Sequence, residues 1–200
     1  MTIVERVRES KATELDRLGS SKAVLALTGA DLDTLTVLRA AAAGEARAAE
    51  TFDDWAGNEA DEAARGHWKR VAEQEREHAE RVASAAEGEL TVESGTDALH
   101  EYLRELMETD ERVGGFVGRC LVADATLLQL VNFFVNESEE AHAELFRELR
   151  AETADSLEAA ESLVDEESVA VSAAEKAIAV SYDAYADSLS EIGIDAKPVC

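Results

Sequence analysis

The sequence has 200 residues but only two cysteines and one proline, and aromatic side chains make up 5% of it. Cys120 lies in a long apolar stretch and Cys200 is the last residue, so the sequence has neither a disulfide framework nor a paired CxxC motif. This spacing excludes a zinc ribbon and a rubredoxin-type iron site. Because proline and glycine interrupt the chain so rarely, long segments rich in Ala, Leu and Glu remain, which is the composition of helices.

Positive charge is also scarce, since 19 Lys and Arg stand against 44 Asp and Glu and give a formal net charge of −25. A surface of this sign repels the phosphates of nucleic acids and of anionic lipids, so we expect neither nucleic acid nor a membrane as a partner. Hydrophobic residues still make up 46% of the sequence, which is enough to bury a core. We interpret the acidity as a halophilic, haloarchaeal-type composition, and an acidic protein of ordinary salt conditions is the alternative.

We interpret the sequence as having no apolar run long enough to span a membrane. The N-terminal segment MTIVERVRESK turns polar at its fifth residue, and no apolar run is taken to reach the roughly 20 residues of a membrane span. We therefore predict no signal peptide and no transmembrane helix, and we expect a cytoplasmic protein.

Hydrophobic periodicity predicts helices along the whole chain, and no segment has the alternation typical of strands. The fold class is therefore all-α, with a four-helix bundle over residues 31–164, an N-terminal helical appendage over 1–30, and a C-terminal helix and tail over 165–200. The bundle helices are predicted at about 31–56, 61–87, 111–134 and 136–164, with a crossover at about 88–111 that includes a short helix at 97–107.

Charged residues occupy positions in the apolar seams of all four bundle helices. In the first helix, Leu38, Glu45 and Phe52 recur every seven residues, which places a carboxylate in the seam. An unpaired buried carboxylate costs several kcal/mol, so such residues indicate a function. In chain order the seam residues are Glu45, Glu75, His78, Asp124, Glu139 and His142. Two E-x-x-H pairs are among them, and this spacing sets a carboxylate and an imidazole on one helical face.

The order Glu, E-x-x-H, acid, E-x-x-H resembles the ferritin-like superfamily of di-iron and di-manganese carboxylate proteins, and most closely rubrerythrin-like proteins without a rubredoxin domain. The resemblance covers about residues 31–164. It implies a ferritin-like four-helix bundle with a long crossover, a di-iron centre in which manganese could replace iron, and an oxidoreductase that acts on dioxygen or peroxide or handles iron. A homodimer is left open as its state of assembly.

The resemblance assigns each seam residue a role as a metal ligand. Glu45 would be the ligand of the first helix, Glu75 a bridging carboxylate and His78 an imidazole ligand. Asp124, Glu139 and His142 would repeat this set in the second half of the bundle.

The heights of these residues along the bundle support the first half of the site better than the second. Glu45 lies about 14 residues before the turn near Glu59 and Glu75 about 16 after it, so the two meet at nearly the same height. Asp124 and Glu139 differ by roughly 13 Å in the same comparison. The mismatch disappears if the third helix stops near Leu130 with Asn132 in the turn. The other alternative is that Glu148, which is level with Asp124, replaces Glu139.

Several residues have a structural interpretation instead. His67 and His100 are predicted at the surface or at a boundary, because neither has an acid at ligand spacing within its own seam. Core packing is predicted for Trp55, Trp68, Phe133, Phe134, Tyr182, Tyr185 and Cys120, and Cys200 is predicted in an exposed tail. The alternative to the enzyme is a non-catalytic ferritin-like helical scaffold with a degenerate metal site, acting as a binding or regulatory protein.

Overall fold

The computed structural model describes residues 2–86 and 90–197, and within these ranges all regular secondary structure is helical. The prediction of an all-α fold is therefore confirmed. The helices are α1 (Ile3–Ser10), α2 (Ala12–Leu18), α3 (Ala23–Thr28), α4 (Thr34–Asn58), α5 (Glu62–Ala85), α6 (Ala98–Glu105), α7 (Thr109–Asn136), α8 (Glu140–Glu161) and α9 (Glu167–Glu191). The predicted start of the crossover near Gly88 and the tail residue Cys200 lie outside the described residues.

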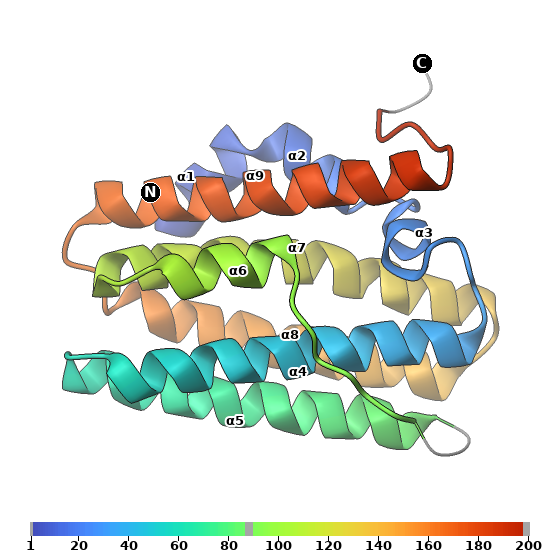
Figure 1. Cartoon of the computed structure of the whole chain (residues 1–200), viewed down its shortest axis with the longest axis horizontal. Coiled ribbons are helices and arrows are strands. Elements are labelled where there is room, and N and C mark those ends of the chain that lie inside the picture. Colours follow the sequence, from blue (N-terminus) through green and yellow to red (C-terminus); the bar gives the residue numbers. More distant parts are fainter. Residues whose placement is uncertain (1, 87–89, 198–200) are drawn as a thin grey trace.

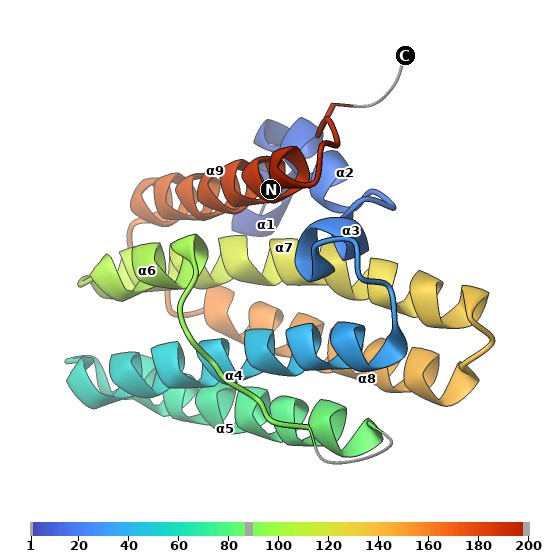
Figure 2. The ribbon, with the colours of Figure 1, turned by 45° about the vertical axis from the view of Figure 1, so that its right-hand side comes forward.

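Two antiparallel helix pairs, α4 with α5 and α7 with α8, form the centre of the molecule (Figure 1). The segment 90–97 runs back across α4 to α6, so α7 starts at the same end as α5 and runs parallel to it. Helix α9 covers α7 on the side away from α4 and α5, as the turned view also shows (Figure 2). The long crossover predicted between the second and third bundle helices is thus present.

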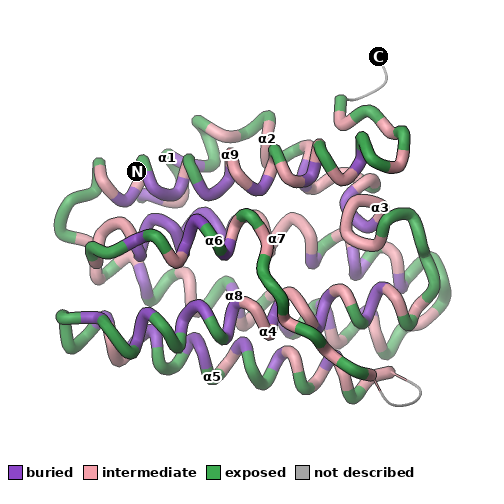
Figure 3. The backbone as a smooth tube through the Cα atoms, viewed as in Figure 1, coloured by how far each residue is buried: buried purple, intermediate pink, exposed green. Residues whose placement is uncertain are grey.

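Aspartates at helix N-termini account for where three of these helices begin. The side chains of Asp33, Asp61 and Asp97 accept hydrogen bonds from backbone N–H groups three residues further on, at α4, α5 and α6. Such caps satisfy N–H groups that have no partner inside the helix. Buried positions then follow the inward side of each long helix (Figure 3).

Helix α7 is the central helix of the fold. By length and composition it could cross a membrane, which corrects the prediction that no apolar run is long enough. Half of its most apolar window is buried, and α8 and α9 pack along it. A Cβ atom on Gly114 or Gly118 would lie 2.1 Å or 2.6 Å from the backbone oxygen of Ala170 or Ala174. The close approach of α9 therefore requires glycine at both positions.

The terminal helices share a hydrophobic core with the bundle. Ile3 and Val7 of α1 belong to the same buried cluster as Val117 of α7 and Ile178 of α9. Polar contacts add to this packing, because Arg17 donates a hydrogen bond of 2.6 Å to the Tyr182 hydroxyl. The segments predicted as appendages therefore pack against α7 and extend the bundle core.

Candidate metal centre

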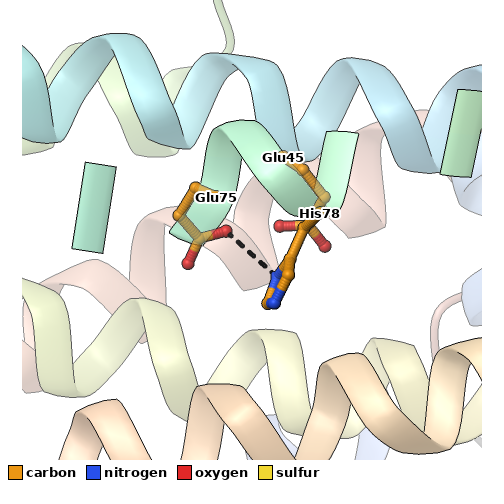
Figure 4. Close-up of side chains that lie close together, drawn as sticks. All are labelled: Glu45, Glu75 and His78. Carbon is orange, nitrogen blue, oxygen red and sulfur yellow. Dashed lines mark ion pairs between the residues drawn. The ribbon is translucent and has the colours of Figure 1, made fainter. Parts of the chain in front are cut away.

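Glu45 of α4 and Glu75 and His78 of α5 lie together in the interior of the bundle (Figure 4). Each offers one ligand atom, and these atoms all lie within 4.8 Å of one another. Among the described residues, no other group of three His, Cys, Asp or Glu side chains meets this geometry. All three side chains are buried. The prediction that Glu45 and Glu75 meet at one height is therefore confirmed.

A buried arginine from α7 completes the interior cluster. Arg119 donates to both oxygens of Glu75, at 2.8 and 2.9 Å, and to Glu45 at 3.0 Å. Its guanidinium forms a bidentate pair with Glu75, which is among the strongest charge-assisted contacts in proteins. Two carboxyl groups thus face one fixed positive charge.

The two carboxyl groups differ in their pKa values. Burial raises the pKa of Glu75 well above its ordinary value, and the Glu45 carboxylate adds to this rise while Arg119 opposes it. Burial also acts to raise the pKa of Glu45, but hydrogen bonding with Glu75 and the charge of Arg119 outweigh it, so the net direction is down. Glu45 is therefore the charged member of the pair, and Glu75 retains a proton to higher pH.

The imidazole of His78 has one partnered nitrogen and one unpartnered nitrogen. Its Nε2 lies 2.6 Å from Oε2 of Glu152 on α8. Its Nδ1 is buried without a hydrogen-bond partner, and it lies 3.9 Å from Oε2 of Glu75. Arg81 in turn donates to both oxygens of Glu152 and to Glu148. The cluster therefore receives one side chain from α7 and one from α8, in addition to the three from the first helix pair.

The structure does not bring the other predicted ligands to this cluster. Asp124 lies 2.7 Å from Nε of Arg150 and is half-buried on the side of α7. Helix α7 continues unbroken to Asn136, so no turn forms near Asn132 and the mismatch in height between Asp124 and Glu139 remains.

The second E-x-x-H pair lies at the end of the bundle, where α8 begins. Nδ1 of His142 lies 2.6 Å from Glu139, and its Nε2 lies 3.1 Å from the backbone oxygen of Ala85. Glu139 also accepts a hydrogen bond from Thr34. Thr34, Glu139 and His142 line a cleft of about 800 Å³. Both nitrogens of His142 are partnered. The alternative residue Glu148 is exposed and pairs with Arg81, so it does not take the place of Glu139.

Sequence reasoning missed Arg119 and Glu152, although both had a detectable signal. Arg119 lies seven residues after Arg112 in an otherwise apolar stretch, which places the two arginines on one buried face of a helix. The position of Glu152 near His78 follows from the antiparallel packing of α5 and α8. Because His142 is level with Ala85, the residues near position 149 are level with His78.

The prediction that His67 and His100 lie at the surface or at a boundary is wrong, because both are buried. His67 packs edge-on against Trp68 and Phe116, and burial lowers its pKa to about 4. Nδ1 of His100 lies 2.8 Å from Oδ1 of Asp97, the residue that caps the N-terminus of α6. Cys120 is buried as predicted, and burial raises the pKa of its thiol to about 12.

Comparisons of the chain with protein-family models, with curated proteins and with solved structures returned no match. The chemistry of the interior cluster is therefore the basis for assigning a function. Two carboxylates and one imidazole are a ligand set suited to iron, manganese or zinc. The unpartnered Nδ1 of His78 adds a free metal-ligand atom next to Glu75.

Proposed function

We propose that this protein is a ferritin-like metal-binding protein that holds one divalent transition-metal ion at Glu45, Glu75 and His78. The proposal is carried by the buried, unpartnered Nδ1 of His78, which lies 3.9 Å from the buried carboxyl group of Glu75 within the Glu45, Glu75 and His78 cluster. A buried polar atom without a partner is costly, and a native structure normally satisfies it. A metal ion between this nitrogen and the two carboxylates would satisfy all three groups and balance their charge.

The topology supports the ferritin-like part of the proposal. Two antiparallel helix pairs joined by a long crossover enclose inward-facing carboxylates and an E-x-x-H pair, as in di-iron carboxylate bundles. We propose one ion rather than two because Asp124, Glu139 and His142 lie elsewhere and Arg119 takes the corresponding place on α7. Iron or manganese is the proposed ion, and bound iron would supply redox chemistry with dioxygen or peroxide.

Arg119 favours a second candidate function. Its three hydrogen bonds already neutralise part of the charge on Glu45 and Glu75. In this alternative the arginine replaces the metal altogether, and the protein is a non-catalytic helical scaffold that acts by binding a partner.

Metal titration separates the two candidates. Chelator-treated protein is titrated with Co(II), Mn(II) and anaerobic Fe(II), and bound metal is counted by elemental analysis after dialysis. We expect one ion per chain, lost in the double variant Glu75→Gln, His78→Ala. The matched control is the double variant Glu139→Gln, His142→Ala, which removes the same motif from the end of the bundle and is expected to keep the ion.

Each outcome assigns a function. No bound ion in the unmodified protein would leave the Arg119 scaffold as the function. Two ions per chain, with losses in both double variants, would instead support the dinuclear centre that the sequence predicts. For the loaded iron form, consumption of dioxygen or peroxide is then compared between the unmodified protein and the Glu75→Gln, His78→Ala variant.

A further inference from the structure

The geometry points to Glu152 as a positioning residue for the metal centre: its carboxylate holds His78 so that Nδ1 is the nitrogen presented to Glu45 and Glu75. This inference rests on the proposed function and adds to it a contribution from the second helix pair. Glu152 itself does not contact the two carboxylates of the cluster; it acts through the imidazole.

Hydrogen bonding defines which nitrogen of His78 is free. Nε2 lies 2.6 Å from Oε2 of Glu152. A carboxylate can only accept, so Nε2 carries the proton and donates it, and the neutral imidazole then has its lone pair on Nδ1. Nδ1 is the atom that is buried, unpartnered and 3.9 Å from Glu75. The same arrangement, in which one nitrogen of a histidine binds metal and the other donates to a carboxylate, recurs in metalloproteins.

Arg81 fixes Glu152 from the solvent side. Its Nη1 donates to both Glu152 oxygens, at 3.0 and 2.9 Å, and its Nη2 donates to Glu148 at 2.6 Å. Two hydrogen bonds to one guanidinium keep Glu152 in its anionic form and restrict its orientation. The side chain of Glu152 is 42% exposed, whereas that of His78 is 1% exposed. Glu152 can therefore be replaced without leaving a large cavity in the core.

Glu148 provides a matched control for Glu152. Both carboxylates belong to α8, lie one helical turn apart, bind Arg81 and are substantially exposed. Only Glu152 reaches His78. Any effect shared by the two residues comes from Arg81 or from general surface charge, and an effect confined to Glu152 comes from the imidazole.

The experiment measures the Co(II) dissociation constant of chelator-treated full-length protein, using visible absorbance, for Glu152→Ala, Glu152→Gln and Glu148→Ala. We expect Glu152→Ala to weaken binding by about 10- to 100-fold, as for other carboxylates behind a metal-bound histidine. Glu148→Ala should stay within about twofold of the unmodified protein. Glu152→Gln should be intermediate, because its amide can accept from Nε2 or donate to it and no longer selects one tautomer.

A second measurement reports the imidazole directly in the metal-free protein. Nitrogen-15 NMR of the ring should show the Nε2–H form of His78 in the unmodified protein and in Glu148→Ala, and a mixture of tautomers in Glu152→Ala. Unchanged Co(II) binding in Glu152→Ala, or equal losses in Glu152→Ala and Glu148→Ala, would overturn the inference alone. Absence of Co(II) binding in the unmodified protein would overturn the proposed function and this inference together, so the two failures are distinguishable.

Discussion

Arg112 and Arg119 lie seven residues apart on one face of α7, and each pairs with carboxylates inside the bundle, but their surroundings differ. Each guanidinium nitrogen of Arg112 and each carboxylate oxygen of Glu59 has a partner. Its Nε donates to the Leu106 backbone oxygen, and its terminal nitrogens donate to Glu59 and Asn58. Glu59 also accepts from the Thr109 hydroxyl. One positive charge here meets one negative charge, and both charged groups are fully hydrogen-bonded.

The Arg119 cluster is incomplete by comparison. One guanidinium serves two carboxyl groups, and Nδ1 of His78 next to them has no partner. The pKa values diverge accordingly. Burial acts to raise the pKa of Glu59, but its hydrogen bonds and Arg112 lower it overall, whereas the pKa of Glu75 is raised well above its ordinary value. The satisfied cluster is suited to stabilising the fold, and the unsatisfied cluster is suited to receiving a cation.

The largest expected effect comes from breaking the satisfied cluster. Arg112→Met leaves Glu59 buried without its counter-ion, and we expect a loss of about 3–5 kcal/mol in the free energy of unfolding, measured with urea. Arg147→Ala is the control, because its pairs with Glu140 and Glu144 are exposed and screened by solvent, so its loss should change the free energy of unfolding far less. Equal losses in the two variants would show that the Arg112 cluster has no special role in stability.

Low pH should lower the free energy of unfolding because of His67, which lies at the same end of the bundle and packs on Trp68 beside Glu59. The pKa of His67 is lowered from 6.5 to about 4 by burial, so below pH 6.5 the unfolded chain takes up a proton that the native protein does not. The contribution of His67 to the free energy of unfolding is therefore fully present above pH 6.5. About 3 kcal/mol of it is lost as the pH falls towards 4.

Comparison with His67→Leu isolates this contribution, because the carboxylates of the two proteins are the same. We expect the difference in unfolding free energy between the two proteins to change by that amount between pH 7 and pH 4. A difference that is constant with pH would contradict the assignment.

The two arginines should also differ in their effect on metal binding. Arg119→Met frees Glu45 and Glu75 and removes a competing cation, so we expect the Co(II) dissociation constant to fall by roughly tenfold, or about 1.4 kcal/mol. Arg112→Met should leave it unchanged. Weaker Co(II) binding in Arg119→Met would mean that the arginine holds the carboxylates in place and does not compete with the ion.

The smallest effect is expected at Asp124. Its pair with Arg150 is partly exposed, so Asp124→Asn should lower the free energy of unfolding by less than about 1 kcal/mol. Because Asp124 lies outside the cluster, metal binding should not change. A loss of bound Co(II) in this variant would place Asp124 at the metal centre. It would then support Asp124, Glu139 and His142 as ligands from the second half of the bundle.

Periodicity alone predicted most of the fold. The seams of the four long helices, the crossover and the last helix follow from hydrophobic spacing and scarce glycine and proline, and the helix ends differ from prediction by a few residues. The N-terminal appendage is predicted most coarsely, because the helical segment expected over residues 1–30 is divided into short helices, with one break near Lys11. Spacing within a chain does not reveal such a break.

The part of the site on two helices joined by a short turn was predictable. The part on helices that a long connection separates was not. Glu45 and Glu75 flank one turn, so counting residues fixes their relative height. Arg119 and Glu152 reach the cluster from helices whose placement depends on the crossover and on packing with α9. The ligand set predicted from the sequence contains only acids and histidines, whereas the partner of the buried carboxylates on α7 is the cation Arg119.

The crossover gives the cluster a place in the order of folding. Arg119 lies 44 residues from Glu75 and 74 from Glu45, and His78 lies 74 residues from Glu152, so its contacts join distant parts of the chain. The α4–α5 and α7–α8 hairpins can each form locally and early, but contacts between distant segments form late because closing long loops costs entropy. The complete cluster therefore exists only after the two hairpins dock. Binding of an ion there would report the last step of folding and hold the hairpins together once it is complete.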